Sequence, residues 1–157
     1  MKLTKDLREF VGDGGVTKVI WTIFTNPCFH SVVLYRLSSF FYRIKFHIFA
    51  KIIWYINRML YSVDIDYRAN LSGGFMLIHG LGTVIGKDVI SKGSLCVYQG
   101  VTIGGSGKSK KTDDGKELWQ PVIEEGVTIY SNAMVLGPIH ISKDCVIKAG
   151  DRVTIDC

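Results

Sequence analysis

The second half of this chain repeats an aliphatic residue every six positions. Twelve of the thirteen leading positions are aliphatic, and Ser91 is the exception. The leading positions are Ile65, Leu71, Leu77, Ile85, Ser91, Val97, Ile103, Ile123, Ile129, Val135, Ile141, Ile147 and Val153. The count slips once, by two residues at Thr83 and Val84, and a polar segment between Ile103 and Ile123 interrupts it once.

A period of six fits neither an isolated helix, which repeats every 3.6 residues or so, nor an alternating strand. It fits a solenoid in which each hexad forms one short flat face and the leading residue points into a core shared by stacked coils. The fifth position of each hexad is mostly small or aliphatic too, from Ala69 and Leu81 to Cys145. We therefore predict a parallel β-helix over residues 62–157.

Residues 1–61 predict a basic, aromatic and helical segment. Asn26-Pro27 interrupts its apolar sequence, and proline both lacks an N–H and restricts the residue before it. We expect one helix before this break and one or two after it, ending at about Leu60.

The charge of this first segment is one-sided. Six cations, no acidic residue and twelve of the eighteen aromatic residues lie between Asp13 and Asp64. The longest uncharged run, Val19 to Tyr35, has 17 residues and contains Pro27, so it falls short of a comfortable membrane span. The pattern fits a helix lying on an anionic bilayer. A helical cap packed against the β-helix or another subunit fits equally well, and the two can coexist.

Composition excludes several other classes of protein. The four cysteines form no close pair that would indicate a zinc site or a redox motif, and the polar first fifteen residues do not resemble a signal peptide. We expect a cytoplasmic protein, at the inner face of the membrane if the helices bind lipid. The net charge of +5 is accounted for by those helices, so we expect no nucleic-acid partner.

The polar segment at about 104–121, "GGSGKSKKTDDGKELWQP", contains four lysines. Insertions in repeat folds leave the stacked core as loops, so this segment should project from the solenoid. It has two interpretations. It forms a lid and a positive patch for a phosphorylated ligand or an acidic acceptor, or it is a flexible, solvated excursion.

Several motifs resemble those of the hexapeptide acyltransferase superfamily, and of its serine acetyltransferase-like members in particular. The resemblance covers residues 60–150 and runs through "VDID", "LSGGFMLIHGLGTVIG", "VYQGVTIGGSGKS" and "PVIEEGVTIYSNAMVLGPIHI". It implies a left-handed β-helix that takes acetyl from acetyl-CoA without a metal. It further implies His79 as the catalytic base and Asp64 as its carboxylate partner.

This implied chemistry is reasonable for these residue types. An imidazole has an ordinary pKa of about 6.5 and can accept the proton of a hydroxyl that attacks a thioester. The register also places His79 on a face of the coil, two positions after the inward Leu77. The resemblance implies that Gly104, Gly105, Ser106, Gly107 and Lys108 bind the CoA, and glycine there would let a backbone N–H stabilise the oxyanion.

The amino-acid site of serine acetyltransferases is not retained. Ile78 stands where that family has an aspartate, and Trp119-Gln120 where it has Arg-His, so neither charge of a free amino acid finds a partner. An indole is a good platform for a pyranose ring. We therefore expect the acceptor to be a bacterial surface polysaccharide or its sugar precursor, as for capsule and exopolysaccharide O-acetyltransferases.

Three alternatives were weighed against this interpretation. A serine acetyltransferase would use free L-serine despite Ile78, and a membrane-associated scaffold would release no thiol from acetyl-CoA. A zinc carbonic anhydrase needs three histidine ligands, whereas the repeat half has only His79 and His140, so we set it aside. The resemblance implies a homotrimer or a dimer of trimers, with CoA bound between adjacent β-helices. Since few hexads follow Lys148, either the affinity for CoA is weakened or a neighbouring subunit completes the CoA groove.

Overall fold

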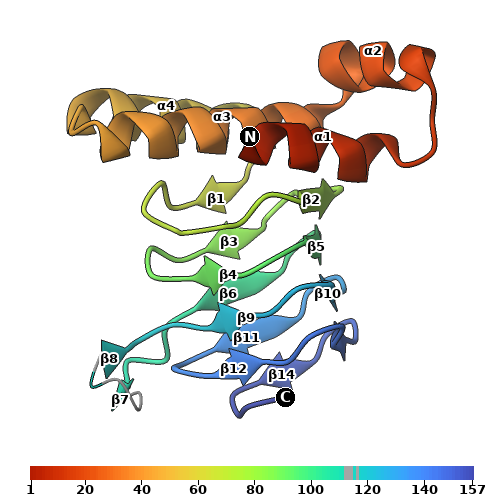
Figure 1. Ribbon diagram of the computed structural model, residues 1–157. Helices are drawn as coiled ribbons and strands as arrows, with labels where there is room; N and C mark the ends of the chain where they lie inside the picture. Colours follow the sequence, from red (N-terminus) through yellow and green to blue (C-terminus); the bar gives the residue numbers. More distant parts are fainter. Residues whose placement is uncertain (112–114, 116) are drawn as a thin grey trace.

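The computed structural model describes residues 1–111, 115 and 117–157. Four helices precede the strands (Figure 1): α1 (Lys2–Val11), α2 (Val16–Thr25), α3 (Pro27–Arg43) and α4 (His47–Tyr61). The predicted break is the start of α3, where the Asn26 side chain accepts a hydrogen bond from the Phe29 N–H at 3.0 Å and Pro27 occupies the first turn. Ser62, in the left-handed region, ends α4.

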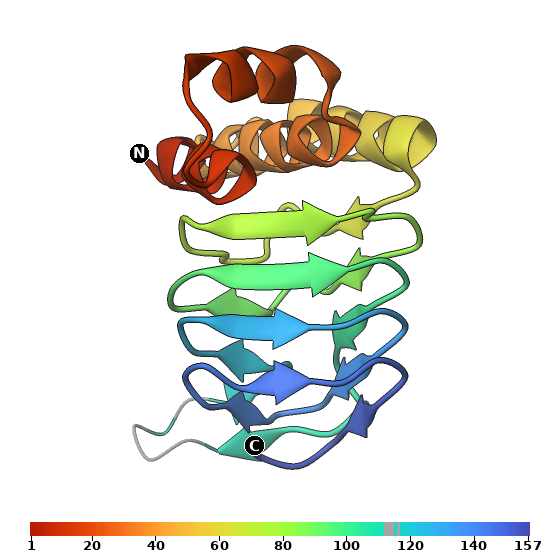
Figure 2. The same cartoon turned by 90° about the vertical axis from the view of Figure 1, so that its right-hand side faces the viewer.

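Short parallel strands then wind into a three-sided coil. One sheet (sheet A) consists of β1 (Asp64–Ile65), β3 (Val84–Ile85), β6 (Thr102–Gly104), β11 (Met134–Leu136) and β14 (Arg152–Val153). A second (sheet B) consists of β4 (Ile90–Ser91), β9 (Val122–Ile123) and β12 (His140–Ile141). The third (sheet C) consists of β2 (Phe75–Ile78), β5 (Leu95–Tyr98), β10 (Val127–Ile129) and β13 (Val146–Ile147). Figure 2 views the stack with sheet C in front.

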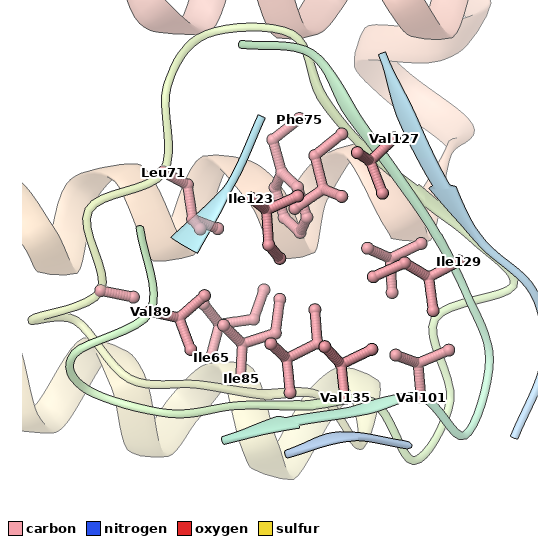
Figure 3. Close-up of a cluster of buried hydrophobic side chains, with 14 of the residues drawn as sticks. Ile65, Leu71, Phe75, Ile85, Val89, Val101, Ile123, Val127, Ile129 and Val135 are labelled. Atoms are coloured by element: carbon pink, nitrogen blue, oxygen red, sulfur yellow. The ribbon is translucent and has the colours of Figure 1, made fainter. Parts of the chain in front are cut away.

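The core is the interior of this coil. The leading residues of successive coils stack in register, for example Leu77 on Val97 and Val97 on Ile129, and all three are at most 2% exposed. Figure 3 shows such side chains pointing inward from all three faces. The non-aliphatic leading residue, Ser91, is buried as well, and its hydroxyl accepts a hydrogen bond from the Ser72 N–H at 2.9 Å. The hexad prediction is therefore confirmed, and a satisfied hydroxyl explains its exception.

The two-residue slip in the hexads lies at the corner between sheet C and sheet A. Elsewhere this corner spans six residues, as from Val97 to Ile103, but from Leu77 to Ile85 it spans eight. Leu81 was expected in a fifth, small or aliphatic position, yet it is 61% exposed, while Thr83 is fully buried and donates to the Tyr98 carbonyl at 3.1 Å. The extra residues lengthen the turn before Thr83, and this places Leu81 outside the core.

The helices cover the first coil. The helix α1, which the sequence did not predict, is anchored by the fully buried carboxylate of Asp6. This carboxylate accepts the backbone N–H groups of Gly74 and Phe75, each at 2.9 Å, and pairs with Arg36 of α3 at 2.8 Å. Among the described residues, none of the helices is both long enough and apolar enough to cross a membrane.

The predicted insertion leaves the coil after β6 and returns before β9. It contains a two-stranded hairpin, β7 (Lys110–Lys111) with β8 (Glu117–Leu118), seen at the lower left of Figure 1. Residues 112–114 and 116 of the predicted loop lie outside the described part of the chain. The coil continues past the insertion in register, with Ile90 beside Val122.

Candidate active site

His79 lies at the lengthened corner between sheets C and A, directly after β2. Its backbone has a φ of 62°, in the left-handed region, and Gly80 and Gly82 follow with φ of 58° and 73°. This sharp turn leaves the His79 residue exposed, as the register predicted. Histidine is among the residues that tolerate such a conformation, and the adjoining glycines adopt it at no steric cost.

A small, mostly apolar pocket of about 190 Å³ adjoins His79. It lies between this corner, the start of α3 and the end of α4, and it is lined by Pro27, Cys28, Ser31, Leu60, Tyr61, Val63, His79, Gly80 and Leu81. Burial raises the pKa of the Cys28 thiol, and a hydrogen bond with the His79 backbone partly opposes that rise. The Cys28 thiol therefore lines the pocket in its protonated form and is a poor nucleophile.

Asp64, the expected carboxylate partner of His79, is bound to α4. One carboxylate oxygen accepts from the indole N–H of Trp54 at 2.9 Å, and the other pairs with Arg58 at 3.0 Å. The Arg58 guanidinium also lies over the Trp54 ring, 5.1 Å from its centroid. Within the part of the chain that the structure describes, no hydrogen bond joins Asp64 to His79. Their pairing stays a prediction.

The residues expected to bind CoA divide between two clefts. Ser106 and Lys108 line a cleft of about 690 Å³ together with Lys110, Arg152 and Asp156, and Lys110 pairs with Asp156 at 3.3 Å. Gly105 and Gly107 instead line a cleft of about 280 Å³. Gly104 ends β6, and apart from its two chain neighbours no heavy atom of the described residues lies within 4 Å of the point where its Cβ would be. A ligand can therefore approach the main chain closely at Gly104.

Trp119 and Gln120 line the smaller cleft with Lys87 and Asp88. Trp119 is 45% exposed. The side-chain amide of Gln120 lies against Gly86, and its Oε1 is buried without a hydrogen-bond partner among the described residues. A buried, unpaired amide oxygen costs about 1–3 kcal/mol. The same oxygen is a ready acceptor for a polar group that enters the cleft.

Ile78 lies beside a pair of tyrosines that the sequence did not predict. Ile78 stacks beside Tyr98 on the outer face of sheet C, and the Tyr98 ring lies 4.8 Å from that of Tyr130. All three residues directly follow a leading hexad residue, which is the signal that could have identified them. They form an apolar and aromatic ladder that starts next to His79.

Within a single copy of the chain, His79 and the glycine-rich insertion do not lie close together. All strands of sheet A are parallel; His79 precedes β3, whereas the insertion follows β6. The two lie at opposite ends of this face, about 10 Å or more apart at the usual rise of a strand. Within the described residues, no three His, Cys, Asp or Glu side chains gather as a metal site.

Comparison with known proteins identifies the relatives of this chain. It is 33% identical over 147 residues to a serine acetyltransferase of Bacillus pumilus, covering 94% of this chain and 65% of the relative. It is 31% identical over 130 residues to a serine acetyltransferase of Helicobacter pylori, covering 83% of this chain and 72% of the relative. The chain belongs to the serine acetyltransferase family. No family model matches it.

Solved structures of this family have the same fold. The serine acetyltransferase of Neisseria gonorrhoeae aligns with a TM-score of 0.85 at 29% identity, over 99% of this chain and 57% of that one. Serine acetyltransferase 1 of Entamoeba histolytica aligns with a TM-score of 0.83 at 28% identity, over 99% of this chain and 58% of that one. The fold is therefore the predicted left-handed β-helix with N-terminal helices. The chain spans roughly half to two thirds of the length of the curated relatives it matches best.

Proposed function

We propose that this chain is an acetyl-CoA-dependent O-acetyltransferase in which His79 is the general base. The observation that carries the proposal is the placement of His79, exposed on a lengthened corner beside a small pocket. Its family membership supports the reaction class, since the relatives named above are acetyltransferases.

Acetyl-CoA supplies the acetyl group as a thioester. The His79 imidazole accepts the proton of the acceptor hydroxyl while that oxygen bonds to the thioester carbonyl carbon. The carbon–sulfur bond then breaks, and the imidazolium returns the proton to the leaving thiolate. General-base help of this kind contributes about 10²–10⁴ in rate. Asp64 supports the imidazolium by its charge, and Trp54 and Arg58 hold its carboxylate in place.

The cleft of about 690 Å³ fits the phosphates of CoA. Lys108, Lys110 and Arg152 line it. Lys110 is paired with Asp156 of the same cleft, which leaves an excess of positive charge that attracts a polyanion. The open backbone at Gly104 supports the approach of the thioester to an N–H donor.

The site is completed by a second copy of the chain. Since His79 and the insertion lie at opposite ends of sheet A, a neighbouring β-helix has to place its insertion beside His79. We propose a homotrimer, or a dimer of trimers, which closes such head-to-tail contacts into a ring. We place it in the cytoplasm, which supplies acetyl-CoA, at the inner face of the membrane.

The first candidate acceptor is L-serine, because the relatives at up to 34% identity are serine acetyltransferases. The second is a hydroxyl of a saccharide, which the site residues favour. Ile78 offers no charge to an ammonium group, and Trp119, Tyr98 and Tyr130 offer exposed or half-buried aromatic faces to a sugar ring.

One assay tests both the reaction and the acceptor. Purified protein is given acetyl-CoA with either L-serine or bacterial oligosaccharides, and free thiol is followed. We expect thiol release with one acceptor and a loss of about 10²–10⁴ in rate for His79→Asn. Asparagine tolerates the left-handed backbone at this position, so the variant should keep the fold. His140→Asn, on the outer face of sheet B, is the matched control.

Each outcome has a distinct meaning. Turnover of serine alone identifies a serine acetyltransferase, and turnover of saccharide alone makes Trp119→Ala the next variant. Thiol release that His79→Asn leaves intact would contradict the assignment of the base. No release with either acceptor would favour the alternative of a non-catalytic, membrane-associated scaffold.

A further inference from the structure

The helical cap carries a large apolar surface that the β-helix does not cover. On α4, Ile48, Ile52, Tyr55 and Met59 are 75%, 50%, 57% and 67% exposed. Their spacing of three or four residues places them along one side of the helix. The opposite side of α4 is buried, as shown by Ala50 and Asn57. One side of α4 therefore packs on α3, and the other side exposes apolar side chains to solvent.

The exposed apolar side chains continue onto the neighbouring helices. Phe46 and Phe49 lie with ring centroids 6.0 Å apart, Phe49 stacks on Phe41 at 5.8 Å, and Phe41 contacts Phe40 at 5.7 Å, so the surface passes from α4 to α3. On α2, Trp21 and Phe24 are 63% and 74% exposed. We call these exposed apolar side chains of α2, α3 and α4 the outer helical face. Exposed apolar side chains in this number mark an interaction site.

The charged residues within the three helices of this face are all cationic. The segment between Asp13 and Asp64 contains no carboxylate. Two of its cations are engaged toward the coil, since Arg36 pairs with Asp6 and Arg58 with Asp64. Lys18, Lys45 and Lys51, one each on α2, the turn after α3 and α4, are exposed.

We propose that the outer helical face binds an anionic lipid bilayer, with α2 and the exposed sides of α3 and α4 directed toward the headgroups. Apolar and aromatic side chains would enter the acyl boundary, and the lysines would meet the lipid phosphates. Pairing of this face with a second copy would set cations against cations, whereas anionic lipid is complementary to them. The proposal does not depend on the acetyltransferase activity.

The fold allows this orientation. The helices lie at one end of the stacked coils, with α3 and α4 side by side across the first coil and α2 farther out (Figures 1 and 2). Because the described helices are too short or too polar to cross a bilayer, they would lie on it. The coils and the β7–β8 hairpin would then project away from the lipid.

Flotation with vesicles tests the proposal on the full chain. Vesicles of phosphatidylcholine alone are compared with vesicles that contain phosphatidylglycerol, at low and high salt. The test variant is Ile48→Glu, on the outer helical face, and the matched control is Ile155→Glu, because both isoleucines are 75% exposed. Lys45→Gln with Lys51→Gln tests the cations, and Lys143→Gln with Lys148→Gln is the charge-matched control on the coil.

We expect binding to anionic vesicles that weakens with salt. Ile48→Glu should reduce it by roughly ten-fold or more, because a carboxylate replaces an inserted side chain. Each removed lysine should reduce it about five-fold. The two control variants should bind like the original chain. Absence of binding, or equal loss in the controls, would overturn the proposal. The proposal would also be overturned if the chain bound no vesicles and formed a larger oligomer in solution that Ile48→Glu divides. That result would identify a second copy as the occupant of the face.

Discussion

At the scale of single residues, the corner at His79 illustrates how an interruption of a regular coil exposes a side chain. A regular corner holds its residues close to the core, whereas two additional residues and a run of positive φ values turn the chain outward here. A β-branched residue at position 79 would be strained in that conformation. The backbone and the proposed chemistry therefore restrict this position independently.

Cys96 provides a prediction at the same scale. Burial raises the pKa of its thiol to about 11, and the nearby Glu9 carboxylate adds to the rise, because both disfavour the thiolate. Its alkylation by iodoacetamide, measured by mass spectrometry, should be slow at pH 8 and should rise about ten-fold per pH unit up to the pKa. Glu9→Gln lowers that pKa and should speed the reaction at pH 8. Equal reactivity of Cys96 and the exposed Cys157 at pH 8 would contradict this.

At the scale of elements, α1 depends on its contacts more than on its own sequence. Its single buried carboxylate, Asp6, joins three elements: α1 itself, α3 through Arg36, and the start of β2 through two backbone N–H groups. Isolated helices of ten residues are marginal in water, so this anchoring decides whether α1 forms.

We expect Asp6→Ala to lower the free energy of unfolding by about 3–5 kcal/mol, because the variant leaves Arg36 and two backbone donors without their partner. Urea denaturation at fixed protein concentration measures this. Lys143→Ala, which breaks an exposed pair with Glu125 at 3.5 Å, should change it by less than about 1 kcal/mol. Similar values for the two variants would show that the buried pair does not anchor α1.

These contacts explain what the sequence could predict. The coil and its inward residues follow from the period of six, because that period is a direct result of coil geometry. The helix α1 could not be predicted, since Asp6 and Arg36 meet only in the folded chain. For the same reason the binding of Asp64 by Trp54 and Arg58 had no local signal. Leu81 was misplaced because a slip can be counted on either side of it.

At the scale of the whole molecule, the proposed site is distributed over two corners, and only assembly would complete it. His79→Asn removes the base from one corner. Gly104→Val fills open space at the other, where an added Cβ meets no atom within 4 Å, so it should block ligand approach without disturbing the fold.

Mixing these two variants tests whether the site is shared. Each alone should be inactive, but co-expressed chains should recover activity, since about a quarter of the interfaces in a randomly mixed ring carry both original residues. Thiol release from acetyl-CoA measures the recovery, and light scattering measures the assembly. A monomeric, active protein, or mixed chains without activity, would contradict the shared site.

The insertion between β6 and β9 also has a consequence for how such proteins diversify. It leaves and re-enters the coil at one corner, and the ladders beyond it remain in register, with Thr102 beside Met134 and Ile90 beside Val122. Mutations that lengthen or recompose the insertion therefore do not have to be compensated in the core. Under the proposed function, proteins that share this coil could therefore change their acceptor through a single excursion, while the inward residues of the core stay the same.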